Sequence, residues 1–324
     1  EGESCPECGG ELSEPRMFNL MFKTFIGPVE DDGSVAWLRP ETAQGIFVNF
    51  RNAQEASRQK IPFGIAQIGK AFRNEITVGN FIFRSREFEQ MELEWFCHPD
   101  EADQWLEYWL QARFDWYLSM GVRRERLRLR PHTDDELAHY AKACQDVEYE
   151  FPFGWSELEG VAHRGTYDLD QHIEHSGKDI RYLDPQSHEK YVPVVIESSG
   201  GVDRTVLTLL ADAYDEDEIG GEERMLLRFA PHMAPIKAAV FPLVKREGMP
   251  EMARHIVDEL RRRSWNVIYD QGGSIGRRYR RMDEVGTPFC ITVDGESAED
   301  QKVTVRDRDT LVQERIAIDS LVPW

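Results

Sequence analysis

Arginine and glutamate residues are concentrated in two adjoining segments, Gly69–Glu75 and Phe83–Glu92. Read at the period of a β-strand, Arg73 and Glu75 share one face of the first segment, because side chains alternate across a pleated backbone. The same period places five side chains of the second segment on one face: Arg84, Arg86, Phe88, Gln90 and Glu92. Such a surface can bind a triphosphate through arginines, stack an adenine on an aromatic ring and offer carboxylates to an amine or a metal ion. The alternative is an exposed hairpin with ordinary ion pairs.

The order of residues in these segments resembles motif 2 of the class II aminoacyl-tRNA synthetases, in which a Phe-Arg-x-Glu strand and a loop precede Arg-x-x-x-Phe. Three longer stretches are similar to the bacterial dimeric glycyl-tRNA synthetases: Leu38–Gly45, Arg86–Glu92 and Asp283–Phe289. Several long motifs in one order are far more specific than a lone short pattern. The resemblance extends over nearly the whole chain.

The resemblance implies an α+β fold, with the antiparallel catalytic sheet of the class II synthetases, flanked by helices, over residues 1–235. Alternating apolar and polar residues predict antiparallel strands over 15–50 and 61–96. An aromatic stripe at helical spacing predicts a helix over 101–119. The apolar run Val192–Ile196 predicts a strand, and the turn and helix after it resemble motif 3. We expect an N-terminal part, carrying motif 1 of the family, to be missing from this sequence.

Residues 236–324 alternate between strand and helix patterns, which indicates a compact α/β domain with a partly parallel sheet. The resemblance implies that this is an anticodon-binding domain. Strands are expected over 238–244, 266–269, 289–293 and 303–305, and helices over 250–263 and near 276–284. The acidic run Asp212–Glu223 is expected to be a solvated boundary before this domain. His163–Tyr191 is expected to be an irregular connection in which His172 and His175 lie on a surface loop rather than in a metal site.

The composition indicates a globular protein, because 41% of the 324 residues are hydrophobic and can form a sizeable core. No apolar run approaches the roughly 18 residues needed to span a bilayer and no signal-peptide pattern opens the chain, so we expect a cytoplasmic location. The five cysteines lack the pattern of a disulfide scaffold and are expected to be reduced. Cys5 and Cys8 have half of a zinc-binding spacing, which upstream residues could complete.

The net charge of −20 is unevenly distributed, which bears on a nucleic-acid partner. Residues 236–324 contain 15 basic and 15 acidic residues, so the first 235 residues carry the whole excess. Four arginines of the neutral segment form a cluster that is a candidate tRNA-binding surface: Arg277, Arg278, Arg280 and Arg281. Arg306 and Arg308 form a second basic cluster. Such patches can contact phosphates on an acidic protein, although a solvated helix face is an equal alternative.

The resemblance implies a ligase that activates glycine with ATP, with Mg²⁺ present, and transfers glycine from glycyl-adenylate to the 3′ end of glycine tRNA. Such chemistry depends on positioning and charge neutralisation. Arg73, Glu75 and Arg204 are the implied catalytic residues, and Glu157 is the candidate Mg²⁺ ligand. The implied ATP-binding residues are Arg73, Asn74, Glu75, Phe83, Arg84, Ser85, Arg86, Glu87, Phe88, Glu157, Leu158, Gly201, Val202, Asp203 and Arg204.

For glycine, the resemblance implies that Glu41 and Glu92 hold the ammonium group and that Arg164 pairs with the carboxylate. The full set of implied substrate-binding residues is Glu41, Phe88, Glu89, Gln90, Met91, Glu92, Arg164, Glu197, Ser198, Ser199, Gly200 and Gly201. Family members have an acidic residue where this chain has Thr166, which changes the expected surroundings of Arg164. The resemblance also implies a homodimer.

Two rival functions remain on the sequence alone. A catalytically inactive relative could keep the fold as a nucleic-acid-binding subunit, but it would be expected to lose the ATP-binding arginines and acids that this chain retains. A free-standing ligase that adenylates an amino acid without using tRNA is disfavoured by the C-terminal domain. Pyrophosphate exchange with each amino acid is the most useful single experiment, because an inactive relative would not support it.

Overall fold

The computed structural model describes residues 4–5, 8–11, 17–246 and 248–321. The chain divides into two compact units. The first consists of residues 1–102, 138–142 and 163–204, and the second of residues 103–137, 143–162 and 205–324. No helix in the described ranges has the length and apolar character required to cross a bilayer.

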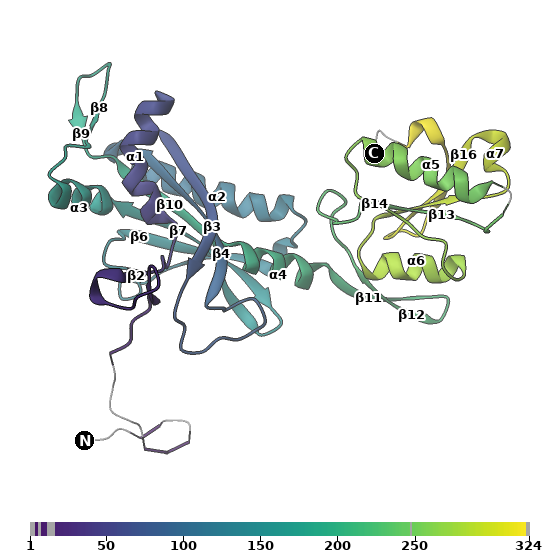
Figure 1. Cartoon of the computed structure of the whole chain (residues 1–324), viewed down its shortest axis with the longest axis horizontal. Coiled ribbons are helices and arrows are strands. Elements are labelled where there is room, and N and C mark those ends of the chain that lie inside the picture. Colours follow the sequence, from purple (N-terminus) through teal and green to yellow (C-terminus); the bar gives the residue numbers. More distant parts are fainter. Residues whose placement is uncertain (1–3, 6–7, 12–16, 247, 322–324) are drawn as a thin grey trace. The chain divides into compact units, whose positions relative to one another are not determined.

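The first unit is built on three long strands that run antiparallel in the order β3 (Phe63–Phe72), β4 (Glu87–Cys97) and β10 (Val194–Gly201). Helix α1 (Ala43–Ser57) packs on β3 and β4 and contacts α3 (Tyr167–Ser176), as Figure 1 shows. Phe47, Phe50, Phe63 and Phe96 form the aromatic centre of this core. The predicted antiparallel hairpin over 61–96 is therefore confirmed.

Three sequence-based expectations about this unit need correction. Strand β10 continues through Gly201 instead of ending at Ile196, because Glu197–Gly201 pairs in register with Gln90–Glu94 of β4. The segment 163–191 is not irregular: it contains α3 and the two-stranded pair β8 (Tyr182–Leu183) and β9 (Lys190–Tyr191). His172 and His175 consequently lie on a helix and not on a loop. The strands expected over 15–50 are found at β1 (Lys23–Phe25) and β2 (Val35–Trp37), which pair antiparallel. The expectation is wrong for 43–50, which belong to helix α1, and residues 15–16 lie outside the described ranges.

The second unit contains three further strands of the catalytic region, in the order β7 (Gly154–Gly165), β6 (Ala143–Phe151) and β5 (Leu127–Pro131). Helix α2 (Ala102–Ser119) confirms the predicted helix, and its residues Leu110, Phe114 and Tyr117 are buried. Helix α4 (Val202–Ala213) begins directly after β10 and continues into this unit.

The acidic run before the C-terminal region is a structured hairpin and not a solvated boundary. Strands β11 (Tyr214–Ile219) and β12 (Glu222–Leu227) pair around Gly220 and Gly221, which both have the positive φ angles that favour glycine. The acidic residues are retained in ordered structure because Asp215 and Asp217 form ion pairs with Arg228 and Arg224.

The C-terminal part of the second unit is a five-stranded sheet with the order β14-β13-β15-β16-β17. Its strands are β13 (Ala238–Pro242), β14 (Val267–Tyr269), β15 (Phe289–Val293), β16 (Lys302–Asp307) and β17 (Gln313–Ala317). Three pair in parallel and the last two are antiparallel, so the partly parallel sheet is confirmed. Helices α5 (Met249–Arg262), α6 (Ile275–Glu284) and α7 (Ser297–Asp300) connect the strands (Figure 1).

Candidate active site

Seven of the fifteen predicted nucleotide-binding residues lie on the loop between β3 and β4, which spans residues 73–86. The expectation that Arg73, Glu75, Arg84 and Arg86 alternate on strands is therefore wrong. Asn80 and Phe81 both have positive φ angles and turn the chain at the tip of the loop. The loop instead holds its shape by local hydrogen bonds: the Arg73 amide donates to the Arg86 carbonyl (2.9 Å), and Arg86 Nε donates to the Glu75 carbonyl (3.0 Å).

At the base of this loop the structure brings Arg73 and Phe88 together. The Arg73 guanidinium carbon lies 5.4 Å from the centroid of the Phe88 ring, and its Nε donates to the Pro40 carbonyl (3.0 Å). The carbonyl contact fixes the guanidinium beside the ring while leaving its terminal nitrogens available. A base on the ring and a phosphate on the guanidinium could thus be bound side by side.

A second arginine and ring pair connects the loop to the start of α4. Arg204 lies with its guanidinium carbon 4.3 Å from the centroid of Phe83, and its Nε donates to the Phe83 carbonyl (3.1 Å). Gly201 precedes this helix, and a Cβ at its position would lie in ordinary contact with the Arg204 side chain, 3.4 Å from Cγ. Asp203 also anchors the helix, because its carboxylate accepts a hydrogen bond from the Glu89 amide (2.8 Å).

The other predicted ATP-binding residues have varied settings. Asn74 donates to the Asn19 carbonyl (3.4 Å) and Ser85 to the Glu87 carbonyl (2.9 Å), while Glu87 forms an ion pair with Lys70. Arg84 is exposed. On β7, in the second unit, Glu157 is exposed and Leu158 is buried. These placements leave the roles of Arg84 and Glu157 as predictions.

A buried carboxylate, Glu92, is the centre of the predicted glycine-binding residues. One oxygen accepts from the amide of Thr42 (2.6 Å) and from its hydroxyl. The other accepts from Gln90 Nε2 (2.8 Å) and Ser199 Oγ (3.0 Å). The side chain is only 3% exposed. Four donors of this kind hold a carboxylate in one orientation and stabilise its negative charge.

Arg164 forms a second cluster in the same unit, on the end of β7. Its guanidinium donates to both oxygens of Asp168 (2.9 Å each) and forms an ion pair with Glu197. Tyr140 covers it, with the ring centroid 4.0 Å from the guanidinium carbon. Burial raises the pKa of Tyr140 to about 12, and Glu197 adds to the effect. Burial likewise raises the pKa of Glu197 to about 7, while Arg164 opposes that shift.

Four residues of this region were missed from the sequence: Thr42, Glu94, Tyr140 and Asp168. Asp168, in the first turn of α3, forms an ion pair with Arg164 near the end of strand β7. Glu94 continues the alternation of Gln90 and Glu92 on the buried face of β4. No pattern in the sequence around Tyr140 indicates that it would lie against Arg164.

Some predicted substrate-binding residues are not brought to the Glu92 carboxylate. Glu89 and Met91 alternate with Gln90 and Glu92 along β4 and so point to its other face. Ser198 similarly alternates with Glu197 and Ser199 on β10. Glu41 is half-buried and accepts a hydrogen bond from Gln44 (3.1 Å). Gly200 and Gly201 end strand β10.

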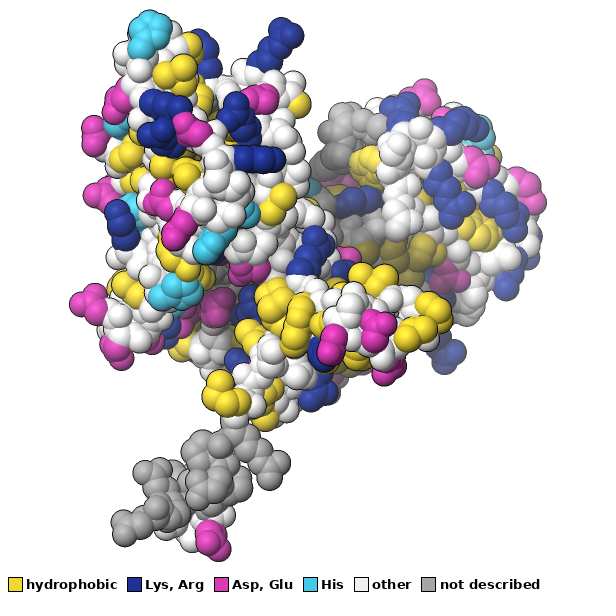
Figure 2. Space-filling view, turned by 60° about the vertical axis from the view of Figure 1, so that its left-hand side comes forward, with side chains coloured by type: hydrophobic (Ala, Val, Ile, Leu, Met, Phe, Trp, Pro, Cys, Tyr) yellow, Lys and Arg dark blue, Asp and Glu magenta, His cyan; other side chains and the backbone are white. Residues whose placement is uncertain are grey.

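The four arginines predicted to bind tRNA do not form one exposed patch on α6. Arg278 is 4% exposed and donates to the carbonyls of Pro242 (2.6 Å) and Leu243 (3.3 Å). Arg281 pairs with Asp270, and Arg280 lies 3.7 Å from Glu222. Arg277 is exposed. On the face drawn in Figure 2, Lys and Arg side chains are interspersed with Asp and Glu side chains.

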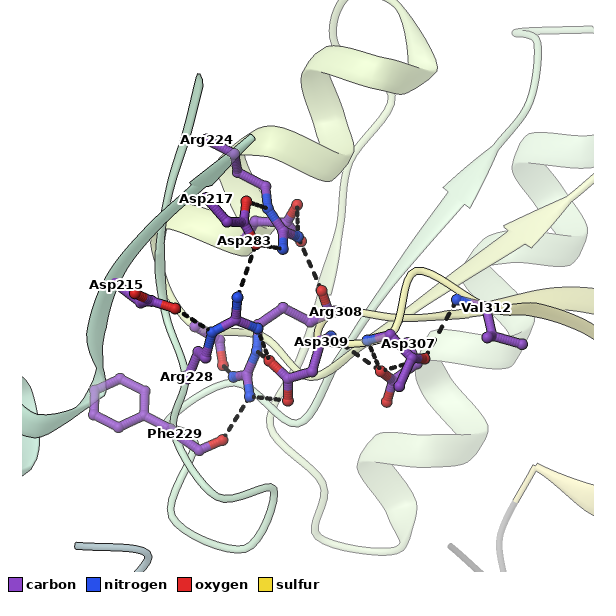
Figure 3. A network of polar contacts seen from close by, with 12 residues as sticks. Asp215, Asp217, Arg224, Arg228, Phe229, Asp283, Asp307, Arg308, Asp309 and Val312 are labelled. Atoms are coloured by element: carbon purple, nitrogen blue, oxygen red, sulfur yellow. Dashed lines mark hydrogen bonds and ion pairs between the residues drawn. The ribbon is translucent and has the colours of Figure 1, made fainter. Parts of the chain in front are cut away.

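Arg306 and Arg308 are also internal and belong to a cluster that we call the arginine network (Figure 3). The network comprises four arginines and four aspartates: Arg224, Arg228, Arg306, Arg308, Asp215, Asp217, Asp283 and Asp309. Asp283 is fully buried and accepts from Arg224 (3.1 Å) and from both terminal nitrogens of Arg306 (2.8 and 2.9 Å). The expectation of a second phosphate-binding cluster is therefore wrong.

One group of potential metal ligands occurs among the described residues: the ligand atoms of His132, Cys144 and Asp146 lie within 4.8 Å of one another. Asp146 already has polar neighbours, because His132 Nε2 lies 2.8 Å and the guanidinium nitrogen Arg130 Nη2 lies 3.3 Å from its Oδ2. These contacts are those of a structural ion pair. Cys5 and Cys8 do not belong to the group.

Comparison with known proteins identifies relatives for nearly the whole chain. Residues 27–213 match the tRNA synthetase class II core domain (G, H, P, S and T), and residues 237–324 match an anticodon binding domain. The glycine–tRNA ligase of Caldanaerobacter subterraneus subsp. tengcongensis is 58% identical over 98% of this chain and 68% of its own length. Those of Clostridium acetobutylicum and Thermobifida fusca are 56% and 52% identical, each over 98% of this chain and over 68% and 71% of their own lengths.

Proposed function

This chain belongs to the glycine–tRNA ligase family of the class II aminoacyl-tRNA synthetases, and from that premise we propose which of its residues bind glycine and ATP. The enzyme joins glycine to its tRNA, and its class uses ATP to do so. The observation that carries the assignment is the buried Glu92 carboxylate, held by Thr42, Gln90 and Ser199 beside strand β10.

Glycine binding is assigned to the carboxylates of this region. Glu92 is oriented by its four donors, and with Glu41 and Glu197 it supplies the negative charge that an ammonium group requires. Arg164 is the cation proposed to bind the carboxylate of glycine. Its guanidinium group would then contact glycine as well as Asp168 and Glu197. Two carboxylates fixing the ammonium group would direct any larger side chain into the walls, which would exclude alanine and serine.

ATP binding is assigned to the two arginine and ring pairs. Phe88 would stack on the adenine and Arg73 would contact the α-phosphate, while Arg204 and Arg84 would contact the terminal phosphates. Arg73 and Arg204 would neutralise charge as a glycine carboxylate oxygen attacks the α-phosphorus and the bond to pyrophosphate breaks. In the second step, a hydroxyl of the terminal ribose attacks the carbonyl carbon of glycyl-adenylate and AMP leaves.

Mg²⁺ is assigned to Glu157. Its carboxylate is exposed, and it offers the hard oxygen ligand that Mg²⁺ prefers. Besides burial, its negative charge helps to raise the pKa of Asp146. When bound, the ion would neutralise the charge of the phosphates. The chain's own contribution is to hold that carboxylate on strand β7.

The anticodon-binding domain is assigned to residues 236–324, and Arg277 is the exposed arginine of α6 best placed to contact tRNA phosphates. We further infer a homodimer in the cytoplasm, as the family resemblance implies. Sedimentation of the purified protein and fractionation of its source cells would test these two inferences.

Glycine-dependent exchange between pyrophosphate and ATP tests the central assignment. Glycine should support exchange far better than alanine or serine. Arg73→Ala and Arg204→Ala should each lower the rate about 100- to 1,000-fold, because each removes a donor to developing charge. Arg58→Ala, an exposed residue at the end of α1, is a matched control and should retain the parent rate. Exchange within threefold of the parent in both arginine variants would overturn their roles, and efficient exchange with alanine would overturn the glycine assignment.

A further inference from the structure

The acidic residues around Arg164 outnumber its positive charge. Four carboxyl groups of the glycine-site cluster are buried in the first unit: Glu92, Glu94, Asp168 and Glu197. Arg164 is the cation that contacts them, and it hydrogen-bonds only Asp168 and Glu197 of the four. Four ionised carboxylates and one guanidinium would leave three uncompensated negative charges in a site with little solvent. Burial of unpaired charge is strongly unfavourable, so protons or a bound cation must reduce this excess.

Of these four carboxyl groups, Glu94 has the fewest groups that would stabilise a negative charge. Its side chain is 0% exposed, and neither oxygen has a hydrogen-bond partner among the residues that the structure describes. On β10 it lies directly opposite Glu197, and on β3 it lies opposite the apolar Ile65. Opposed side chains of an antiparallel pair have Cβ atoms about 4.5–5.5 Å apart. Two anionic carboxylates on opposed, buried residues repel each other, and sharing one proton removes the repulsion.

We propose that Glu94 and Glu197 share one proton before glycine binds, and that binding of the glycine ammonium group releases this proton to solvent. The inference rests on the proposed glycine site. The O–H bond of the carboxylic acid breaks on binding, the proton leaves to water, and the ammonium group replaces its positive charge. The pair then carries two negative charges against the arriving cation. Glu94 acts through Glu197 and is a positioning residue.

The groups that face the pair are consistent with this exchange. Glu92 lies on the same strand as Glu94, Asp168 is contributed by α3, and Glu41 precedes α1, so three of the surrounding elements contribute acids. Among the described residues, the cation that faces the pair is Arg164 of β7. Burial raises the pKa of Glu94 well above its ordinary value, and Glu197 raises it further. A new cation lowers these pKa values, and by linkage a lowered pKa means that binding releases protons.

Calorimetry measures the released proton directly. The glycylsulfamoyl analogue of glycyl-adenylate, which carries the ammonium group, is titrated into the full chain at pH 7 in buffers of different ionisation enthalpy. Because the pKa of Glu197 is about 7, we expect release of roughly half a proton per site. Glu94→Gln should reduce the release, since it removes the carboxyl group that lies opposite Glu197 and shares its proton. Glu94→Asp should restore it.

Two controls separate this inference from its premise. Glu159→Gln changes a buried glutamate of the second unit, paired with Arg113, and should leave the proton count unchanged. If Glu92→Gln does not weaken binding of the analogue, the glycine site itself is wrong. If binding depends on Glu92 but the parent chain releases no proton, or Glu94→Gln releases as many, proton sharing is wrong and the glycine site stands.

Infrared difference spectroscopy of the unmodified chain provides a test that does not depend on any variant folding. Binding of the analogue should remove the carbonyl stretch of a protonated carboxylic acid and add the bands of a carboxylate. A difference spectrum in which no protonated carboxyl band is lost would overturn the proposal.

Discussion

Two ionic clusters of this enzyme differ in how their charges are balanced, and the first of them is partly exposed at Asp215, Arg228 and Asp309. The arginine network contains four arginines and four aspartates, and its guanidinium groups also donate to backbone carbonyls of Gly286, Phe229 and Arg308 (Figure 3). The glycine-site cluster contains four buried carboxyl groups against Arg164. In the first cluster the protein satisfies its own charges, whereas in the second it leaves negative charge to be satisfied by a ligand.

This difference indicates what each cluster does. Within the second unit, the arginine network joins the hairpin β11–β12 to α6 and β16, and its members are neutralised in place. An excess of buried acid is costly for folding, so a site that keeps one is explained by the cation that it binds. Mutations in the arginine network should therefore lower the stability of the fold, whereas mutations in the glycine-site cluster should weaken glycine binding.

The largest expected effect is on stability, for Asp283→Ala in the arginine network. The change leaves the buried guanidinium groups of Arg224 and Arg306 without their shared carboxylate. Breaking a buried ion pair from one side costs about 3–5 kcal/mol. We expect a loss of this size in the free energy of unfolding measured in urea. Asp258→Ala, at an exposed position of α5, is the control and should leave the free energy of unfolding nearly unchanged. A loss below about 1 kcal/mol for Asp283→Ala would contradict the view that the paired charges of the arginine network stabilise the fold.

Glu92→Gln should affect function more than stability. It keeps the shape of the side chain but removes the charge offered to the ammonium group, and a hydrogen bond to a charged group contributes about 1.5–3 kcal/mol. The glycine KM in pyrophosphate exchange should rise about 10- to 100-fold. The urea midpoint should stay near that of the parent, because the excess of buried negative charge is reduced. An unchanged KM with a strongly lowered midpoint would show that Glu92 is structural.

The neighbouring arginines of α6 offer a matched pair. Arg278→Ala removes donors to the carbonyls of Pro242 and Leu243 and should lower the free energy of unfolding by about 1–3 kcal/mol. Arg277→Ala, at an exposed position, should leave stability unchanged and weaken tRNA binding. The slope of the logarithm of the binding constant against the logarithm of salt concentration should become shallower by about one. Filter binding at several salt concentrations measures the second effect. Equal effects of the two variants on tRNA binding would contradict the separation.

The smallest effect concerns pH. The pKa of Glu197 is raised from its ordinary 4.5 to about 7 in the folded protein, because burial disfavours the charged form. Its contribution to stability is therefore complete below pH 4.5 and is lost as the pH rises through 7, at no more than about 1.4 kcal/mol per pH unit. Glu197→Gln should flatten the decline of stability between pH 5 and 7. Glu299→Gln, at an exposed position, should not, and an unchanged slope in Glu197→Gln would refute the shift.

Local patterns predicted the C-terminal region well. The strand expected over 289–293 is found at those residues, and the helices expected over 250–263 and near 276–284 are found within one residue. Apolar periodicity was sufficient there because each element presents one face to a single core. A loop was expected between the two segments, but its two ends, 73–75 and 83–86, were misread as strand, since alternation of charged residues carries no information about where backbone pairing ends.

The sequence by itself indicated the chemistry of this protein, because the motifs proposed to bind ATP and glycine are short segments whose residue types and order can be read directly. It could not determine which charged residues are buried. Arg278, Arg306 and Arg308 look like a basic surface in the sequence but are internal, because their partners come from other elements. Glu94 meets Glu197 only because β4 pairs with β10, about 100 residues along the chain. Burial and opposition of charges are properties of strand pairing and packing, and these decided which acids stabilise the fold and which remain for the substrate.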